Sequence, residues 1–439
     1  MKPADIHYDL VVVGDAAIDI LNDKKPPLRR PGGIFYSSLA AAAFGLKVGV
    51  VSNNGDKKNE FIQSINKFGV DTQGIQPNLD CCVEFQLSNI NEVYPQVLAK
   101  KLLKSRRTCK TSSRFFLTKA VLLYPALDYE FLYNFAKNVK KHGGLVFLDL
   151  QHDLLSLDHL ENLLRITDVV FASRSELLYF LEVNNDMMAV DKLRKYGAEK
   201  VVIKYGIGGS SVYLNNDNIL RIPSYLANFK CTIGAGDVYN SVFILNLLKQ
   251  NDYRIAGEKA AITASVFSEC LDYPSYFLKI KQINFTKEKH NRVSVIAHPE
   301  ELTKIKIYLA GHFLSQPMRN WVDTISHIFE SRGFSVFNPY RDAGIIAINS
   351  PNIERIRCFN DDITALSSST LVVALLDGAS QGGTSWEMGY AYSKGIPIIG
   401  LLTDDHINIS NMIYSSCLSI CSDLPQMINE VFQFIATRN

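Results

Sequence analysis

Short apolar runs separated by polar turns recur between residues 8 and 280. The run from Leu10 to Val13 is closed by Gly14-Asp15, which is typical of a buried parallel strand that ends in a tight turn. Stretches with helical spacing, such as Tyr129–Lys141 and Met187–Tyr196, lie between several of these runs. Strands and helices that alternate in this way predict a mostly parallel sheet with helices on both faces. Further strands of this type are expected at Val48–Ser52, Val121–Tyr124, Leu145–Leu148, Val169–Phe171 and Val201–Lys204.

The pattern changes twice along the chain. Residues 80–118 are alternating and polar, which indicates a small antiparallel excursion or lid. Asn284–Thr303 is polar at its start, contains a proline and leaves little room for a helix, so a linker is predicted at 286–303 between domains at 1–285 and 304–439. After it the alternation restarts as a second, smaller doubly wound unit. Its expected strands are Ile305–Leu309, Ser335–Phe337, Leu371–Leu376 and Ile396–Leu401, and its expected helices are Met318–Ser331, Ile353–Ser367 and Thr384–Ser393.

Composition narrows the classes of partner. The 439 residues contain 46 Lys+Arg and 44 Asp+Glu, and a net charge of +2 gives no electrostatic footprint for nucleic acid. No apolar run approaches the ~20 residues that span a bilayer, and the first residues lack a signal-peptide pattern. The eight cysteines form no CxxC pair, which suits a reducing compartment. We therefore expect a cytoplasmic protein that binds neither membrane nor nucleic acid. Trp321 and Trp386 are expected in the core.

The first chemical motif is Thr232-Ile233-Gly234-Ala235-Gly236-Asp237, which leads into an apolar helix at Val238–Leu248. Glycines at a helix start let a ligand approach the backbone, and the free N–H groups there attract a phosphate. An aspartate in the first turn can take a proton from an attacking hydroxyl. Asp237 can equally serve only to cap the helix, since Asp is favoured in a first turn. The motif alone leaves both interpretations open.

Other motifs precede this one in a fixed order. They are Gly14-Asp15-Ala16-Ala17-Ile18-Asp19, Gly32-Gly33, Asn53-Asn54-Gly55-Asp56 and Ser173-Arg174-Ser175-Glu176. The series resembles the ribokinase-like (PfkB) family of sugar and nucleoside kinases over residues 8–280. The resemblance implies ATP and Mg²⁺ as cofactors, with Asp237 as general base and Glu176 at the metal. It also implies ATP contacts from Thr232, Gly234, Ala235 and Gly236, and sugar contacts from Asp19 and Gly33.

The chain departs from this family at several positions. Cys231 stands where the family usually has Asp, Ile233 where it has Thr, and Ser173 where it has Asn. Ser37 or Ser38 stands where Asn is frequent. The changes at Ser173 and Cys231 fall where magnesium and phosphates would be organised. They favour binding of a sugar or nucleotide over fast phosphoryl transfer.

The second chemical motif follows the predicted strand Leu371–Leu376 and runs from Asp377 to Ala391. Ligands of open parallel sheets bind beyond the carboxyl ends of strands, where this glycine-rich loop lies. A purely structural alternative exists, because Thr384-x-x-Glu387 is also a capping box in which Glu387 would only bond the backbone N–H of Thr384.

The wider pattern resembles nucleoside 2-deoxyribosyltransferases and related nucleotide N-hydrolases over residues 304–415. It consists of Ile307-Tyr308-Leu309-Ala310-Gly311, Asp361-Asp362 and the stretch Gly383–Ala391. The resemblance implies that Glu387 is the nucleophile, that Tyr308 orients it, and that Asp362 recognises or protonates the base. It implies no cofactor for this domain. Substrate contacts are expected from Gly311, Asp377, Gln381, Gly383 and Asn411.

Departures occur in this domain too. Gln381 stands where the family commonly has Asp, which leaves the base preference open, and His312 stands where Pro often follows the first-strand glycine. In the family an Asn from a neighbouring subunit completes the sugar site. Asn408 and Asn411 are the candidates here, and such sharing implies a homo-oligomer.

These observations predict an α/β protein in two parts. The first is a ribokinase-like three-layer domain with a mostly parallel sheet and a small lid, and the second is a smaller flavodoxin-like doubly wound parallel-sheet domain. The leading hypothesis is cleavage or exchange at the N-glycosidic bond of a nucleoside or nucleotide, coupled to a domain that phosphorylates or senses a sugar or nucleoside. The alternative is a degenerate kinase-like sensor that controls an N-glycosidase acting on nucleotides such as NAD.

Overall fold

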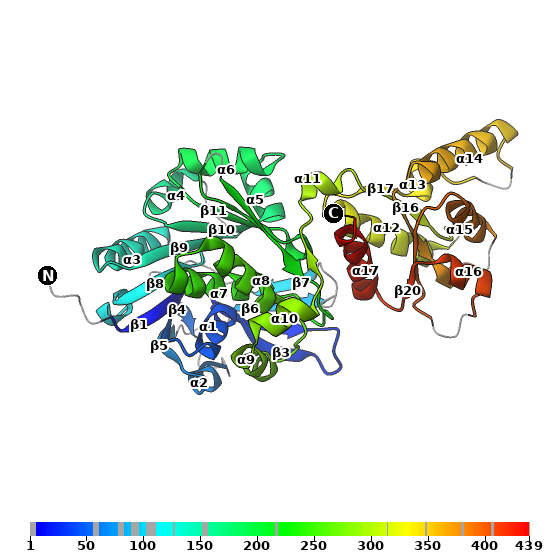
Figure 1. The fold of residues 1–439 in the computed structure, drawn as a ribbon. Coiled ribbons are helices and arrows are strands. Elements are labelled where there is room, and N and C mark those ends of the chain that lie inside the picture. Colours follow the sequence, from blue (N-terminus) through cyan, green and yellow to red (C-terminus); the bar gives the residue numbers. More distant parts are fainter. Residues whose placement is uncertain are drawn as a thin grey trace. The chain divides into compact units, whose positions relative to one another are not determined.

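The computed structural model divides the chain into two compact units, Met1–Ile296 and Ala297–Asn439 (Figure 1). None of the described helices is both long enough and apolar enough to cross a membrane. The described residues are 6–55, 61–77, 83–88, 96–101, 111–125, 128–151, 157–215, 218–313, 315–346, 349–378, 382–404 and 408–438.

The N-terminal unit is built on a large sheet with the strand order β13-β12-β11-β10-β9-β8-β1-β4-β5. From β5 to β11 every neighbouring pair is parallel, and β12 and β13 continue the sheet antiparallel. The mostly parallel sheet predicted from the apolar runs is therefore confirmed. Its strands are β1 (Tyr8–Val13), β4 (Val48–Gly55), β5 (Val70–Pro77), β8 (Thr118–Leu123), β9 (Leu145–Leu150), β10 (Val169–Ser173), β11 (Val201–Lys204), β12 (Ser210–Tyr213) and β13 (Ile219–Ile222).

Helices cover both faces of this sheet, which explains why its central strands are mostly apolar. Leu10 and Val12 of β1 pack on one face, in a core shared with α1, α7, α8 and α9, while Val11 and Val13 pack on the other face with α3 to α6. The helices of this unit are α1 (Ile34–Ala43), α2 (Phe61–Asn66), α3 (Tyr129–Lys141), α4 (Leu157–Leu164), α5 (Arg174–Leu181), α6 (Asp186–Lys195), α7 (Ala235–Gln250), α8 (Tyr253–Ser268), α9 (Tyr273–Lys281) and α10 (Phe285–Asn291), with short 3₁₀ turns η1 (Ser113–Phe116) and η2 (Gly206–Gly208).

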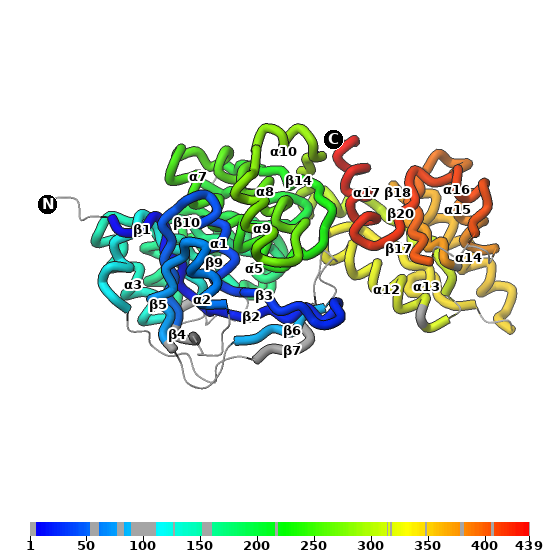
Figure 2. The backbone as a smooth tube through the Cα atoms, turned by 90° about the horizontal axis from the view of Figure 1, so that it is seen from below, coloured from blue at the N-terminus to red at the C-terminus, as the bar shows by residue number. Residues whose placement is uncertain are grey.

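A second, four-stranded sheet has the order β3-β2-β6-β7. The strands β2 (Ala16–Leu21) and β3 (Leu28–Gly33) run along the edge of the unit beside β6 (Val83–Ser88) (Figure 2). β6 pairs antiparallel with β7 (Gln96–Lys101), as expected for the excursion at 80–118. β2 and β3 were not expected as strands, yet they carry Asp19 and Gly33 of the early motifs.

The C-terminal unit is a five-stranded, all-parallel sheet with the order β17-β16-β18-β19-β20, as a flavodoxin-like domain requires. α14 and α15 pack on the face that carries the side chains of Tyr308 and Val372. Its strands are β16 (Lys306–Ala310), β17 (Ser335–Phe337), β18 (Leu371–Leu375), β19 (Ile398–Leu401) and β20 (Ser419–Cys421), and its helices are α11 (Pro299–Leu302), α12 (Gln316–Glu330), α13 (Pro339–Asp342), α14 (Asn352–Ser367), α15 (Gly383–Ser393), α16 (Asn411–Ser416) and α17 (Leu424–Ala436), with the 3₁₀ turn η3 (Leu376–Gly378).

The predicted linker is more structured than its sequence indicated. The expectation that Asn284–Thr303 leaves little room for a helix was wrong, because α10 and α11 both form within it. Asn284 caps α10 by accepting a hydrogen bond from Lys287 N at 3.0 Å. Between the two helices, β15 (Ser294–Val295) pairs with β14 (Ser224–Tyr225) of the N-terminal unit.

Candidate functional site

The first candidate site lies where β9, β10 and β11 end and α7 begins. Gly234 caps α7 with φ +87°, a conformation that favours glycine. A Cβ at this position would lie 2.6 Å from the ring of Tyr36, so a side chain is excluded there twice over. Within the described residues, the backbone N–H groups of Gly236 and Asp237 donate to no backbone carbonyl. The helix start therefore keeps the free donors that bind a phosphate.

Asp237 lies in the first turn of α7 and is partly buried. Burial, and secondly the charge of Asp149, raises the pKa of its carboxyl to about 7, against the opposing effects of the Lys204 charge and a hydrogen bond with Tyr124. Ser37 donates to the backbone carbonyl of Asp237 at 2.8 Å. A carboxyl with a pKa near neutrality is suited to accept a proton from a hydroxyl.

The sequence analysis missed a cation directly under this helix start. Lys204, the last residue of β11, donates from Nζ to Asp149 Oδ1 at 3.2 Å and to Asn240 Oδ1 at 3.0 Å. A charged residue at the carboxyl end of an apolar strand was the available signal, and it occurs at both Asp149 and Lys204.

Asp19, one of the two residues expected at the sugar, is closed off by neighbouring side chains. It is only 4% exposed, and the Tyr36 hydroxyl donates to its carboxylate. The guanidinium of Arg30 lies over the Tyr36 ring, 5.1 Å from its centroid, and bonds the carbonyls of Ile233 and Leu271 at 2.8 and 3.2 Å. Burial raises the pKa of Asp19, while the charge of Arg30 and the Tyr36 hydrogen bond oppose this shift.

Gly33, the other residue expected at the sugar, has φ +59°. A Cβ there would lie 2.2 Å from the Asp15 carbonyl oxygen, so the turn between β3 and α1 requires glycine.

The residues expected around ATP form this helix start, and the residue expected at magnesium follows β10, the strand next to β11. Thr232, Gly234, Ala235 and Gly236 are partly exposed, and Glu176 is partly buried in the first turn of α5, directly after β10. Among the described residues, no three His, Cys, Asp or Glu side chains converge as a metal cluster. Mg²⁺ in phosphoryl-transfer sites is held by one or two carboxylates plus phosphates, so Glu176 and the open helix start fit Mg²⁺ with ATP.

The second candidate site lies beyond the carboxyl ends of β16 and β18 and is centred on Glu387 of α15. Tyr308, from β16, donates to Glu387 Oε1 at 2.8 Å. The capping-box alternative is not what forms, because Gly382 caps α15 without a side-chain bond. Thr384 is already inside the helix and buried. The carboxyl of Glu387 is thus held by Tyr308 of β16 and not by the backbone at the start of its own helix.

Two carboxyl oxygens in this site have no partner among the described residues. They are Oε2 of Glu387 and Oδ1 of Asp362, and both are buried. Burial, assisted by the charge of Asp362 and opposed by the Tyr308 hydrogen bond, raises the pKa of Glu387 to about 8. Burial also raises the pKa of Asp362 to about 6. Buried polar atoms normally find partners, so these two oxygens mark where a polar ligand fits.

The structure also places the other residues expected in the C-terminal site. Gly311 is buried directly after β16, and Gly383 is exposed at the start of α15. Asp377 is already engaged, since its carboxylate accepts from Thr403 N and Thr403 Oγ1, both at 2.8 Å. Asn411 is exposed at the start of α16.

Some expectations for these sites lie outside the described residues. Gln381 is among the undescribed residues, and so are Asp56 and the side chains of Asn53 and Asn54.

Three further residues of this site escaped the sequence analysis. Cys358, one turn before Asp362 on α14, places its Sγ 3.8 Å from Asp362 Oδ2. Phe337 stacks on Tyr308 with ring centroids 5.5 Å apart, and Asn338, which follows β17, is fully buried.

The expectation that Trp321 and Trp386 lie in the core was wrong, because they are 36% and 49% exposed.

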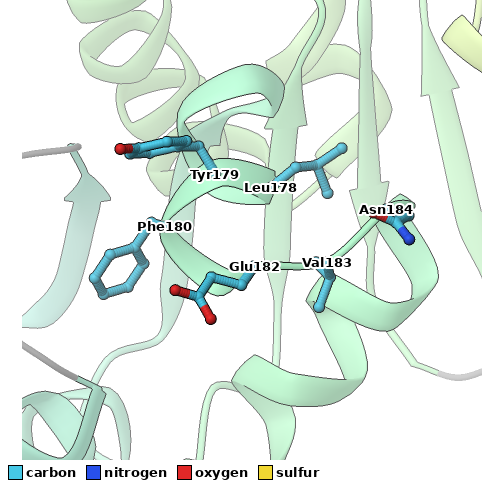
Figure 3. Close-up of a pocket in the computed structure, with 6 residues that line it drawn as sticks. All are labelled: Leu178, Tyr179, Phe180, Glu182, Val183 and Asn184. Atoms are coloured by element: carbon cyan, nitrogen blue, oxygen red, sulfur yellow. The ribbon is translucent and has the colours of Figure 1, made fainter.

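A hollow of about 510 Å³ lies at the end of α5, and none of the expected site residues lines it. Figure 3 shows the side chains that line it, which come from the last turn of α5 and the residues after it. They are Leu178, Tyr179, Phe180, Glu182, Val183 and Asn184.

Comparison with known proteins agrees with the two-part architecture. The curated relatives include the 5-dehydro-2-deoxygluconokinases of Listeria innocua and Bacillus subtilis, 23% and 22% identical over 60% and 59% of this chain and 91% and 89% of theirs. Arabidopsis thaliana ribokinase, solved with ribose and ATP, superposes with a TM-score of 0.53 at 19% identity, covering 63% of this chain and 99% of its own. The adenosine kinase of Sinorhizobium meliloti gives 0.53 at 16% identity, covering 61% and 95%.

Family models match each unit separately. The model described as nucleoside 2-deoxyribosyltransferase like matches residues 304–404. The model described as pfkB family carbohydrate kinase matches residues 31–271, more than half of the chain. The chain therefore belongs to the pfkB family of carbohydrate kinases and carries, in the same polypeptide, a nucleoside 2-deoxyribosyltransferase-like domain.

Proposed function

We propose that the C-terminal unit cleaves the N-glycosidic bond of a nucleoside or nucleotide, and that the N-terminal unit transfers a phosphoryl group to a sugar or nucleoside. The observation that carries the first part is the arrangement of Glu387. One of its oxygens is held by Tyr308 at 2.8 Å, and the other is buried, has no partner within the described part of the chain, and feels the charge of a second carboxyl, Asp362. Two carboxyls flanking one bond are the usual equipment for glycoside cleavage.

The chemistry assigns each carboxyl one role. Glu387 attacks the anomeric carbon as the bond to the base nitrogen breaks, and Asp362 gives its proton to that nitrogen, which keeps the bonding electrons. The result is a free base and a glycosyl ester on Glu387. Water then releases the sugar, or a second base takes it, and the proton from either attacker returns to Asp362. Hydrolysis and base exchange differ only in this last step.

The ionisation of the pair provides the single proton that this division needs. With pKa values of about 6 for Asp362 and about 8 for Glu387, the two carboxyls together hold one proton near pH 7. One acid and one carboxylate are what the reaction needs. In the empty site the proton resides mainly on Glu387. Positive charge that develops at the anomeric carbon beside Glu387 favours its carboxylate and moves the proton toward Asp362.

Asp237 is the proposed base of the N-terminal unit. Its carboxyl, with a pKa of about 7, takes the proton from the acceptor hydroxyl, and the free N–H groups at Gly236 and Asp237 hold the phosphates. ATP with Mg²⁺ supplies the phosphoryl group and neutralises its charge. The relatives named 5-dehydro-2-deoxygluconokinase, ribokinase and adenosine kinase supply the acceptors to try first.

One observation favours a second role for the N-terminal unit, that of a ligand sensor. Asp19 is closed off by Tyr36 and Arg30, so the expected sugar contact is occupied by the protein's own hydroxyl. A sensor would bind ATP or a nucleoside and change the rate of base release through differential affinity for two states of the chain.

Product analysis on the full chain tests the main proposal. The protein is incubated with nucleosides, nucleotides and NAD, with and without ATP–Mg²⁺ and the acceptors above, and products are identified by mass spectrometry. Glu387→Ala should lower base release by at least ~10², whereas Glu354→Gln, an exposed carboxylate on α14, should not change it. Wild-type rates in a folded Glu387→Ala protein would exclude Glu387 as the nucleophile.

The sensor role is tested on Asp237→Asn, which keeps the site's shape. If ATP changes base release several-fold in both the wild type and this variant, sensing is supported, because transfer is not needed. If ATP has no effect on either protein, the sensor role should be dropped.

A further inference from the structure

A buried charge network links three elements beneath the start of α7. Lys204, at the end of β11, and Asp149, at the end of β9, form an ion pair whose side chains are 11% and 6% exposed. The same ammonium group reaches Asn240 on α7. It also lies 3.4 Å from where a Cβ of Gly236 would be, so it sits against the backbone of the helix start itself. The pair connects two strands to the helix that carries Asp237.

Among Lys204, Asp149 and Asp237 there are two acidic groups and one basic group. Asp149 pairs with Lys204 directly, and the charge of Lys204 also acts on Asp237. The other groups that act on Asp237 are Tyr124, which hydrogen-bonds its carboxyl, and the more distant charge of Asp19. A buried carboxylate near another carboxylate is costly, and a nearby ammonium group offsets that cost.

We propose that Lys204 is a positioning residue of the N-terminal site, which bridges Asp149 and Asn240 beneath the helix start and keeps the carboxyl of Asp237 able to ionise. This inference rests on the proposed role of Asp237 as general base. It adds that two residues outside the glycine motif, Lys204 and Asp149, control the ionisation of Asp237. Lys204 acts through Asp237 and not on the acceptor.

The ion pair of Lys204 and Asp149 leads to two predictions of opposite sign for the pKa of Asp237. The charge of Lys204 lowers the pKa of Asp237 and the charge of Asp149 raises it. Lys204→Met should therefore make Asp237 harder to ionise, and Asp149→Asn should make it easier. Each change should displace the titration midpoint by at least about one pH unit, as expected for charges a few ångströms apart in a partly buried site. A residue that only holds the fold together would not produce shifts of opposite sign.

The experiment follows the Asp237 carboxyl by NMR on the full chain without ligand. Aspartate is labelled with ¹³C at the carboxyl carbon, and the Asp237 signal is identified by its loss in Asp237→Asn. Lys204→Met should move the midpoint up and Asp149→Asn should move it down. Lys204→Arg should restore most of the wild-type value. Lys200→Met is the matched control, because Lys200 is a partly exposed lysine directly before β11, and it should leave the midpoint unchanged.

The outcomes separate the inference from the proposed function. An Asp237 midpoint that stays at its wild-type value in folded Lys204→Met, or in Asp149→Asn if Lys204→Met does not fold, overturns the role of Lys204. Opposite shifts support it. Phosphoryl transfer is measured separately in the same variants. Opposite NMR shifts in a protein that transfers no phosphoryl group would leave Lys204 as the residue that sets Asp237 while removing the kinase proposal.

Discussion

At the scale of single residues, the two candidate sites share one physical feature. Each places a carboxyl where burial and a neighbouring carboxyl raise its pKa toward neutrality, Asp237 beside Asp149 and Glu387 beside Asp362. Such groups are unfavourable for the folded state and useful for proton transfer. The sequence motifs around them are unremarkable caps when read locally, so the environment, and not the residue type, marks them as functional candidates.

The raised pKa of Glu387 predicts a pH-dependent gain in stability for Glu387→Gln. Because the pKa rises from 4.5 to about 8 on folding, the folded state binds more protons than the unfolded state between these values. Stability from this group is present below pH 4.5 and is lost as the pH rises through 8. Gln does not titrate, so the variant should be more stable by on the order of 2–4 kcal/mol at pH 8 and by about 1 or less at pH 5.

Denaturant unfolding followed by tryptophan fluorescence provides the measurement. Both tryptophans, Trp321 and Trp386, lie in the C-terminal unit, so the signal reports on that unit alone. A difference in stability between the variant and the wild type that does not grow with pH would mean that Glu387 titrates normally.

The same pair predicts a bell-shaped pH profile for base release. Below about pH 6 both carboxyls are protonated and no nucleophile remains, and above about pH 8 both are ionised and no acid remains. Tyr308→Phe removes the hydrogen bond that lowers the Glu387 pKa, so the alkaline limb should move to higher pH while the maximal rate falls. Tyr390→Phe removes a hydroxyl from α15, the helix of Glu387, that is bonded to Ser367 of α14, and should change neither. A Tyr308→Phe profile with an unmoved alkaline limb would argue against this role.

At the scale of elements, the site in the N-terminal unit depends on how the four-stranded sheet is tied to the glycine motif. Arg30 of β3 bonds the carbonyl of Ile233, next to the start of α7, and that of Leu271. Its guanidinium is almost fully buried and lies over Tyr36. A single side chain thus joins the edge sheet to the anion-binding turn and holds Tyr36 against Asp19.

This arrangement predicts very different costs for two adjacent arginines. Arg30→Ala leaves two part-buried carbonyls without their donor and removes the positive charge that favours ionised Asp19, which should lower the free energy of unfolding of the N-terminal unit by about 3–5 kcal/mol. Arg29→Ala removes a partly exposed ion pair with Glu84 and should cost about 1 kcal/mol or less. Circular dichroism, with the C-terminal unit tracked by its tryptophans, measures both. Equal costs would show that Arg30 is no anchor.

At the scale of the whole molecule, two units with separate cores carry two separate sets of catalytic candidates. A chain of this kind can combine two reactions or let one unit regulate the other, and fold alone does not separate these cases. Independent loss of the two activities does.

Asp237→Asn should lower phosphoryl transfer by ~10² or more and leave base release unchanged. The wild-type transfer rate should rise with pH through about 7, because Asp237 must be ionised to act as a base. Both activities are measured on the same preparation. A loss of base release in folded Asp237→Asn would show that the two sites are coupled. A transfer rate that is flat from pH 6 to 8 would remove Asp237 from its role.

The sequence by itself determined the two-part α/β architecture and the positions of its central strands and helices. It did so because buried parallel strands need continuous apolar runs, and these can be recognised locally in Leu10–Val13 or Leu371–Leu375. It also identified Asp237 and Glu387 as candidates, since each lies within a short motif at a helix start. The sequence did not predict the two linker helices, which are too short to show a helical period. It also did not predict the edge strands β2 and β3, whose residues lack a clear alternation of apolar and polar positions.

Only the tertiary structure decided which side chains surround those candidates. Lys204 meets Asp149 across 55 residues, Tyr36 meets Asp19 from a different element, and Arg30 reaches Ile233 across 203 residues. Periodicity tells where a strand is but not its place in the sheet, and these contacts depend on that order. The sheet brings the carboxyl ends of β9 and β11 to one edge with β10 between them, and there the ionisation of Asp237 is set.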